Sequence, residues 1–331
     1  MAGQTTVIFK LASIFVISEQ LPGEIVVAQA QGIQGEIGWI GVGKMGNPMA
    51  TRLIEAGHRL TICDPVAENR ASLVARGAHV AGTPADLAER CELIFSTIPN
   101  DRALEDIVFG GEEHGSLRSR IGAGSVLVEM STVSPAISRR VAEELSPHGV
   151  GYLRCPISGS TALARSGSLT ALASGDSAAW ERVASLLDTL VARKFYLGPG
   201  EEARYMKLVL NTLVGATSSI LAEALALGAA GGLNDRQMME VVAESVVASP
   251  LIRYKQEMIA QRDFGPAFSV VQMIKDFTLI ADAGRVQQVP MFVTNLIHQQ
   301  YIAAANAGYA EKDFFVLVDW MRTVYQLERD G

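Results

Sequence analysis

The chain is poor in the residues that build disulfide frameworks and metal sites. It has 3 cysteines, Cys63, Cys91 and Cys155, an odd number spaced far apart along 331 residues. A disulfide framework needs an even set of cysteines, and a structural zinc site needs short C-x-x-C spacings. The 5 histidines show no ligand-like spacing either. We therefore expect no bound metal, and we expect reduced thiols and a cytoplasmic location.

Runs of basic residues are also absent, and the net charge is −7. Proteins that bind nucleic acids carry clustered lysine and arginine, so we expect no nucleic-acid partner. Apolar residues make up 49% of the chain and charged residues 19%, which is ordinary for a globular protein. A chain of this length can form about two domains with sizeable cores.

The N-terminal residues only partly resemble a targeting signal. Residues 7–17 are apolar, but the run is short and contains Lys10. Residues 28–30 mimic a signal-peptidase site, yet acidic residues and Pro22 precede them, which makes a poor cleavage region. We therefore predict that residues 1–35 are an N-terminal extension.

A second apolar segment, residues 206–233, is long enough to span a bilayer. Polar residues such as Lys207, Asn211 and Glu223 are spread through it, so we predict a buried helix of a soluble protein and no membrane partner. A helix this apolar must be covered on every side, by its own domain or by a partner subunit. We therefore expect a homodimer or a homotetramer.

Strand-like runs alternate with helical segments over the first half of the chain. The expected helices include residues 47–56 and 65–76. The strand candidates are Glu36–Ile40, Leu60–Cys63, Leu93–Thr97, Ser125–Met130 and Gly151–Arg154. Such alternation is typical of βαβ units and predicts an α/β fold with a doubly wound parallel sheet.

Beyond residues 198–200 helical periods dominate to the C-terminus. A long helix is expected over residues 201–231, and later breaks are expected at Gly231-Gly232, Ser249-Pro250, Gly265-Pro266 and Val289-Pro290. We place the domain boundary near residues 195–203. The prediction is one domain over residues 36–198 and an all-α domain over residues 199–331, which would hold substrate and support dimerisation.

A glycine-rich turn follows the first expected strand and precedes a helix. Its residues are Gly41, Val42, Gly43, Lys44, Met45 and Gly46. Three glycines at this spacing suit a dinucleotide pyrophosphate: one for the tight turn, one for close backbone approach and one for helix packing. Many glycine turns bind nothing, and an empty structural turn is the alternative. The position between strand and helix favours a Rossmann-type NAD-binding domain.

Asp64 ends the second strand, roughly 20 residues beyond the glycine turn. An acid at this place accepts hydrogen bonds from the adenosine ribose and repels a 2′-phosphate. Pro65 follows, where an NADP enzyme often places an arginine. NAD is therefore favoured over NADP, and the alternative is that Asp64 only caps the next helix.

Further candidate residues follow the later strands, at the edge where open α/β sheets bind ligands. Ile98 and Pro99 follow one strand, and Ser131 and Thr132 follow the next. Serine and threonine at such junctions are often only helix caps, and that alternative stays open here. Ser158 and Gly159 follow a further strand and could hold a carboxylate, although a plain turn explains them equally well.

Lys207 is the sharpest chemical candidate, because it lies near the start of an otherwise apolar helix with Asn211 four residues later on the same face. Desolvation lowers the proton affinity of a lysine, which suits acid–base work near neutral pH. The alternative is a boundary lysine that extends its amine to water.

Taken together, these residues resemble the β-hydroxyacid dehydrogenase family, whose members include 3-hydroxyisobutyrate dehydrogenase and the glyoxylate/succinic semialdehyde reductases. The glycine turn with residues 47–50, Ser131-Thr132, residues 156–159 and Lys207 with Asn211 match its motifs in order. Lys275-Asp276 is similar to its C-terminal Lys-Asp pair, and Asp313 falls where its terminal acidic motif lies. The resemblance covers about residues 36–320.

The resemblance implies hydride transfer between a nicotinamide cofactor and a small β-hydroxy acid or its semialdehyde. Lys207 would exchange the proton with the substrate oxygen, and Asn211 would orient that oxygen or the lysine. Ser131, Ser158 and Gly159 would hold a small carboxylate substrate. Lys275 would lie near the nicotinamide.

The chain departs from the family pattern at Arg154-Cys155, where an acid and an alanine are usual, and at Ser160, where a second glycine is common. Arg154 either adds an anion contact or replaces one structural pairing with another.

Two rival interpretations are an imine reductase-like relative and a cofactor-binding scaffold or sensor without turnover. Lys207 counts against both, because such relatives often lack the lysine.

Overall fold

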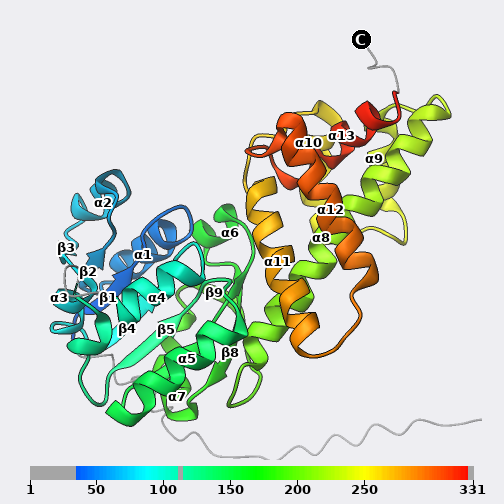
Figure 1. Ribbon diagram of the computed structural model, residues 1–331. Coiled ribbons are helices and arrows are strands. Elements are labelled where there is room, and N and C mark those ends of the chain that lie inside the picture. The colour runs from blue at the N-terminus through cyan, green and yellow to red at the C-terminus, as the bar shows by residue number, and fades with distance from the viewer. Residues whose placement is uncertain (1–34, 111–114, 327–331) are drawn as a thin grey trace, which may run out of the picture. The chain divides into compact units, whose positions relative to one another are not determined.

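The structure is a computed structural model that describes residues 35–110 and 115–326. The predicted extension at residues 1–35 lies outside the described residues, except for Gly35. The described chain begins with an α/β region built on one sheet and continues into a helical region (Figure 1).

Six parallel strands form the centre of the sheet, in the order β3-β2-β1-β4-β5-β6. Their bounds are β1 (Ile37–Ile40), β2 (Leu60–Cys63), β3 (His79–Val80), β4 (Leu93–Ser96), β5 (Val126–Glu129) and β6 (Gly151–Arg154). Every residue of β1, β2, β4 and β5 is buried, because helices cover both faces of a parallel sheet. The order is that of a Rossmann fold, so the predicted fold class is confirmed.

Three more strands extend the sheet and include antiparallel pairs. They are β7 (Ile157–Ser158), β8 (Leu169–Gly175) and β9 (Val191–Tyr196). Strand β8 runs antiparallel to β6 and β7 and parallel to β9. The five predicted strands correspond to β1, β2, β4, β5 and β6, whereas β3 and the strands of this edge were not predicted.

Helices flank the sheet (Figure 1). They are α1 (Gly46–Glu55), α2 (Ala67–Val74), α3 (Pro84–Ala88), α4 (Asp101–Phe109), α5 (Pro135–Leu145), α6 (Thr161–Ser166) and α7 (Ser177–Leu187). Polar side chains begin several of them: Asn100, Ser134 and Asp176 accept hydrogen bonds from the first-turn N–H groups of α4, α5 and α7. Helices α1 and α2 lie within two residues of the predicted ranges.

The helical region contains α8 (Glu202–Ala230), α9 (Asp235–Glu244), α10 (Pro250–Gln261), α11 (Val270–Val286), α12 (Phe292–Ala304) and α13 (Leu317–Val324). The four predicted breaks separate the first five of these helices. Its core is apolar and includes Phe277 and Tyr301, whose ring centroids are 5.5 Å apart. Asp313 lies in this core as the partner of Lys255, with 2.8 Å between carboxylate and ammonium.

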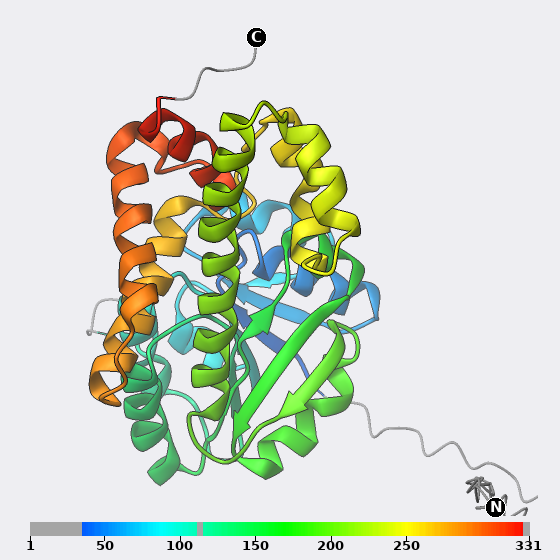
Figure 2. The ribbon, with the colours of Figure 1, turned by 90° about the vertical axis from the view of Figure 1, so that its right-hand side faces the viewer.

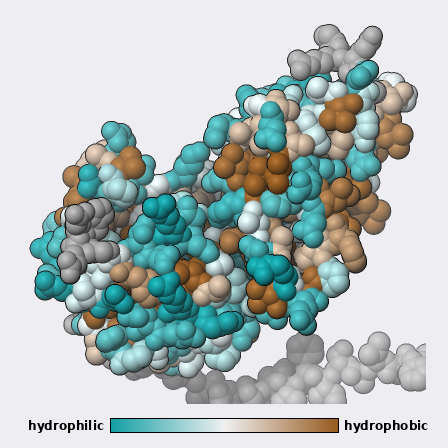
Figure 3. All heavy atoms as spheres, viewed as in Figure 1, coloured by the Kyte–Doolittle hydropathy of each residue, from teal (hydrophilic) through white to brown (hydrophobic). Residues whose placement is uncertain are grey.

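Helix α8 runs through the helical region beside α11, α12 and α13 (Figure 2). Among the described helices it alone is long and apolar enough to cross a membrane by length and composition. The chain does not cover it on every side: Leu213, Ile220 and Leu227 are more than half exposed, and so is Phe292 on α12. Hydrophobic surface is accordingly visible over this region (Figure 3). The predicted association of two or four copies would cover it and stays a prediction.

Candidate active site

The carboxyl ends of five neighbouring strands lie in register. Cys63 pairs with Ile40, Ile40 with Ser96, Ser96 with Glu129, and Glu129 with Arg154. The segments that follow these residues therefore leave the sheet at one edge. They contain the glycine turn, Asp64, Pro99, Ser131 and Ser158, so parallel pairing gathers residues that are far apart in the sequence.

The glycine turn fits a dinucleotide on steric grounds. A Cβ atom at Gly41 would collide with the Thr97 carbonyl, and one at Gly46 would collide with the Gly41 carbonyl. A Cβ at Gly43 would meet only the Asn69 amide, at 3.9 Å. The outer glycines are thus required by packing, while the middle one leaves the backbone open to a ligand.

Charge and dipole at the turn also suit a pyrophosphate. Helix α1 begins at Gly46, so its free N–H groups and positive dipole end lie at the turn. Lys44 is exposed in the turn and adds a cation. The donor set therefore fits a dinucleotide, and the predicted roles of Val42, Lys44 and Met45 stay predictions.

Asp64 is buried and holds the glycine turn in place. One carboxylate oxygen accepts a hydrogen bond from the Val42 N–H at 2.8 Å. The other accepts from the Val66 N–H at 2.8 Å and from the Asn69 amide at 3.2 Å. Helix α2 has its N-cap at Val66, so the alternative of a simple capping aspartate is wrong. A carboxylate has about four acceptor positions, so one remains for the predicted ribose contact.

The two segments after β4 and β5 are tied together and to the helical region. The Ile98 N–H donates to the Ser131 hydroxyl oxygen at 2.7 Å. The Lys275 ammonium, on α11, donates to the carbonyls of Thr132 at 2.9 Å and Pro99 at 3.4 Å. Ser134 forms the cap of α5, so neither Ser131 nor Thr132 is the capping residue that the alternative required.

Lys207 lies half-buried in the second turn of α8. Burial lowers the pKa of its ammonium, the nearby Lys275 cation lowers it further, and the Asp276 carboxylate opposes both. Within the described residues Lys207 forms no ion pair. A cation of this kind can give up and regain a proton more readily than an ordinary lysine.

Asn211, one turn after Lys207, is buried and has a fixed orientation. Its amide donates to the Asp276 carboxylate at 2.5 Å. The other Asp276 oxygen lies 3.0 Å from the Lys275 ammonium. The structure thus brings Lys207, Asn211 and the Lys275-Asp276 pair together.

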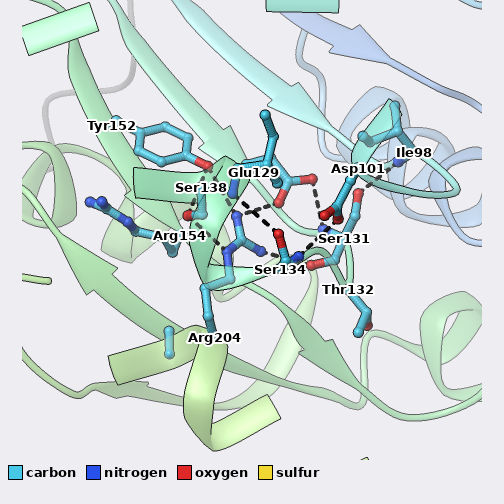
Figure 4. Close-up of polar contacts among 12 residues, drawn as sticks. Ile98, Asp101, Glu129, Ser131, Thr132, Ser134, Ser138, Tyr152, Arg154 and Arg204 are labelled. Carbon is cyan, nitrogen blue, oxygen red and sulfur yellow. Dashed lines mark hydrogen bonds and ion pairs between the residues drawn. The ribbon is translucent and has the colours of Figure 1, made fainter. Parts of the chain in front are cut away.

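A network of buried polar side chains, which the sequence analysis missed, joins the first turn of α8 to the end of β5 (Figure 4). The Arg204 guanidinium pairs with the Glu129 carboxylate and donates to the Ser131 carbonyl at 2.8 Å. It also donates to the hydroxyls of Ser138 and Tyr152, each at 3.1 Å. A signal was present: an arginine in an apolar helix and a glutamate in an apolar strand each need a buried partner.

Arg154 has a structural partner. Its guanidinium pairs with the buried carboxylate of Glu201, with 2.9 Å from Nε to Oε1, and stacks 4.7 Å from the Tyr152 ring centroid. Of the two alternatives left open by the sequence, the structure supports a replaced structural pairing.

Ser158 lies in β7 and Gly159 has φ +138°, and their predicted contact with a carboxylate stays a prediction.

The cysteines and acids do not form further reactive sites in the described part of the chain. No group of three or more His, Cys, Asp or Glu residues there could hold a metal. Burial raises the pKa of Cys63 to about 11 and the pKa of Cys91 and Cys155 to about 12. Thiols with such pKa values stay protonated and are poor nucleophiles.

Comparison with known proteins assigns the family. Residues 36–198 match the model for the NAD-binding domain of 6-phosphogluconate dehydrogenase, and residues 202–321 match that for the NAD-binding region of NADP-dependent 3-hydroxyisobutyrate dehydrogenase. The chain is 31% identical to 2-(hydroxymethyl)glutarate dehydrogenase of Eubacterium barkeri, over 86% of this chain and 93% of that protein. It belongs to the β-hydroxyacid dehydrogenase family.

A further relative agrees with this assignment, and a solved structure shows the same fold. The NAD-dependent L-serine dehydrogenase of Pseudomonas aeruginosa is 30% identical, over 85% of this chain and 96% of that protein. A crystal structure of 3-hydroxyisobutyrate dehydrogenase from Salmonella typhimurium superposes with a TM-score of 0.78 at 24% identity, covering 86% and 99% of the two chains, and shows the same fold. This β-hydroxyacid dehydrogenase is therefore an NAD(P)-dependent enzyme of CH–OH oxidation and reduction.

Proposed function

We propose that this enzyme interconverts a small β-hydroxy acid and its semialdehyde, with Lys207 as the general acid and base. The observation that carries the proposal is a lysine with a lowered pKa and no ion pair within the described residues, one turn from a buried, oriented asparagine. The relatives named for hydroxymethylglutarate and L-serine support a substrate with a carboxylate and a nearby hydroxyl.

Each residue then has a distinct task. In oxidation the neutral Lys207 amine removes the hydroxyl proton, and in reduction its ammonium returns a proton to the carbonyl oxygen. Asn211 orients that oxygen, since Asp276 fixes the direction of its amide. Ser131, Ser158 and Gly159 bind the carboxylate. A bound nicotinamide supplies or accepts the hydride at the adjacent carbon.

Replacing the proposed acid–base residue tests this function. Lys207→Ala should lower kcat about 10²–10⁴-fold, the usual cost of losing a general acid–base group. Cofactor absorbance should be followed with 3-hydroxyisobutyrate, L-serine, 2-(hydroxymethyl)glutarate and succinic semialdehyde. Cofactor affinity, measured by fluorescence titration, should stay unchanged. Near-normal turnover in the variant would contradict the role of Lys207, and no turnover by the wild type with any of these compounds would contradict the substrate class.

For the cofactor, we propose NAD rather than NADP. The buried Asp64 carboxylate at the end of β2 would repel a 2′-phosphate, and the serine dehydrogenase relative is named as NAD-dependent. The ratio of kcat/KM with NAD to that with NADP should therefore exceed one. Asp64→Ala should lower this ratio, and because Asp64 also holds the Val42 N–H, it should weaken binding of both cofactors.

Glu68→Ala is the matched control, since it removes an exposed acid from the first turn of α2. It should leave both the ratio and the two cofactor affinities unchanged. A wild-type preference for NADP would refute the proposed role of Asp64.

A further inference from the structure

Arg204 forms hydrogen bonds with three residues besides the glutamate that neutralises its charge. Its guanidinium carries five N–H donors, and four of them are engaged, by Glu129, Ser131, Ser138 and Tyr152. Both members of the ion pair are buried, with exposed side-chain fractions of 1% for Arg204 and 0% for Glu129. Buried ion pairs add little net stability, so a geometric role explains this pair better than a stabilising one.

The Arg204–Glu129 pair binds both backbone groups of Ser131, its N–H and its carbonyl. The Ser131 N–H donates to the Glu129 carboxylate at 3.0 Å, and the Ser131 carbonyl accepts from Arg204 at 2.8 Å. The Ser131 hydroxyl oxygen accepts from the Ile98 N–H, which leaves its own hydrogen free to donate. The position of this donor is therefore set by the ion pair and by the neighbouring strand end.

The same arginine belongs to the helix that carries the acid–base lysine. Arg204 and Lys207 are three residues apart on α8, so their side chains project from the same face. One rigid helical turn thus connects the guanidinium that holds Ser131 to the ammonium that exchanges the proton. The other ion pair near the start of α8, Arg154 with Glu201, forms no hydrogen bond with Ser131 in the described part of the chain.

We propose that Arg204 is a positioning residue, which together with Glu129 sets the distance between the carboxylate-binding hydroxyl of Ser131 and the Lys207 ammonium. The proposal rests on the proposed function, because it needs a substrate that spans both groups. It makes the ion pair a determinant of specificity for substrates whose carboxylate lies at a fixed distance from the reacting oxygen.

Arg204→Lys is the decisive variant. It keeps the charge beside Glu129, but an ammonium cannot also reach the Ser131 carbonyl as the forked guanidinium does. We expect kcat/KM for 3-hydroxyisobutyrate to fall about 10²-fold, the scale of a small misplacement of reacting groups. The KM for the cofactor should not change. The preference for 3-hydroxyisobutyrate over 3-hydroxyisobutyramide, which lacks the carboxylate, should also shrink.

Arg322→Lys is the matched control, because Arg322 forms a buried 2.6 Å ion pair with Asp235 between α13 and α9. It should leave both the kinetics and the acid-over-amide preference unchanged. Thermal unfolding followed by circular dichroism checks that each variant folds. If Arg204→Lys does not fold, Glu129→Asp gives the second test, since it keeps the charge and withdraws the carboxylate from Ser131 by one methylene.

The outcomes separate the two proposals. Wild-type turnover that depends on Lys207 supports the proposed function whatever Arg204→Lys does. Unchanged acid-over-amide preference in a folded Arg204→Lys or Glu129→Asp enzyme would overturn the positioning role. A rise in the cofactor KM as large as the fall in kcat/KM for 3-hydroxyisobutyrate would also overturn it, because the effect would then be structural rather than directed at the substrate.

Discussion

The first and second turns of α8 carry two cations that their surroundings treat in opposite ways. At Arg204 burial lowers the pKa, but Glu129 and Tyr152 raise it by more, so the net pKa is raised. At Lys207 burial also lowers the pKa, and Asp276 offsets this only in part, so the net pKa is lowered. One cation is held permanently charged, while the other can lose its proton.

The pKa values of the two side chains shift in opposite directions because their charged partners differ, and not because of burial alone. Arg204 faces a carboxylate in direct contact and three further acceptors. Lys207 has no ion pair within the described residues, although Asp276 acts on it electrostatically. This difference supports the two proposed roles, a positioning role for the paired Arg204 and an acid–base role for Lys207. Removing each should therefore have opposite consequences for stability.

The largest expected effect is on the free energy of unfolding. Arg204→Met leaves the buried Glu129 carboxylate without its cation, which should cost about 3–5 kcal/mol. Lys207→Met removes a cation whose charged form burial already disfavours, so stability at pH 7 should stay the same or rise. Urea unfolding followed by circular dichroism measures both changes.

Arg102→Met is the control, because Arg102 pairs with Asp106 in an exposed i,i+4 contact at 3.9 Å. It should change the free energy of unfolding by no more than about 0.5 kcal/mol. If Lys207→Met were as destabilising as Arg204→Met, the distinction between the two turns would be wrong.

The sequence predicts five of the six central strands, but it misses the short β3 and the added edge of the sheet. Strands β1, β2, β4, β5 and β6 are short apolar runs, and all of them appear among the predicted strands. Strand β9 (Val191–Tyr196) is largely exposed and carries charged residues, so hydrophobicity does not mark it. Its existence depends on pairing with β8, and pairing between strands is not encoded in any local pattern.

The candidate site likewise contains residues that a local pattern predicts and contacts that it does not. Motif spacing predicted Lys207, Asn211 and the glycine turn as candidates, because these residues follow strand ends or share a helix face. The partnerships of the buried charges were not predictable, since Arg204 and Glu129 are 75 residues apart and Asn211 and Asp276 are 65 apart. Sequence shows which charges are present, and only the fold decides which of them neutralise one another.

A smaller effect, on the pH dependence of turnover, sharpens the account of Lys207. In the proposed mechanism oxidation requires the neutral amine of Lys207, so the rate of oxidation should rise with pH through the lysine pKa, while the rate of reduction should fall. The Lys275 cation lowers that pKa, so Lys275→Met should raise it and move both profiles to higher pH. Asp276→Asn removes the opposing charge and should move both profiles to lower pH.

Lys275→Arg separates this electrostatic effect from the contacts of the side chain with Thr132 and Pro99. It keeps the positive charge, so the midpoints of the two profiles should stay near those of the wild type even where the maximal rate falls. Initial rates of oxidation and reduction should be measured from pH 5 to pH 11 on each variant, with the exposed Lys312→Met as a remote control. Midpoints that move in the same direction for Lys275→Met and Asp276→Asn would show that the titrating group is not Lys207, because the two charges act on it with opposite signs.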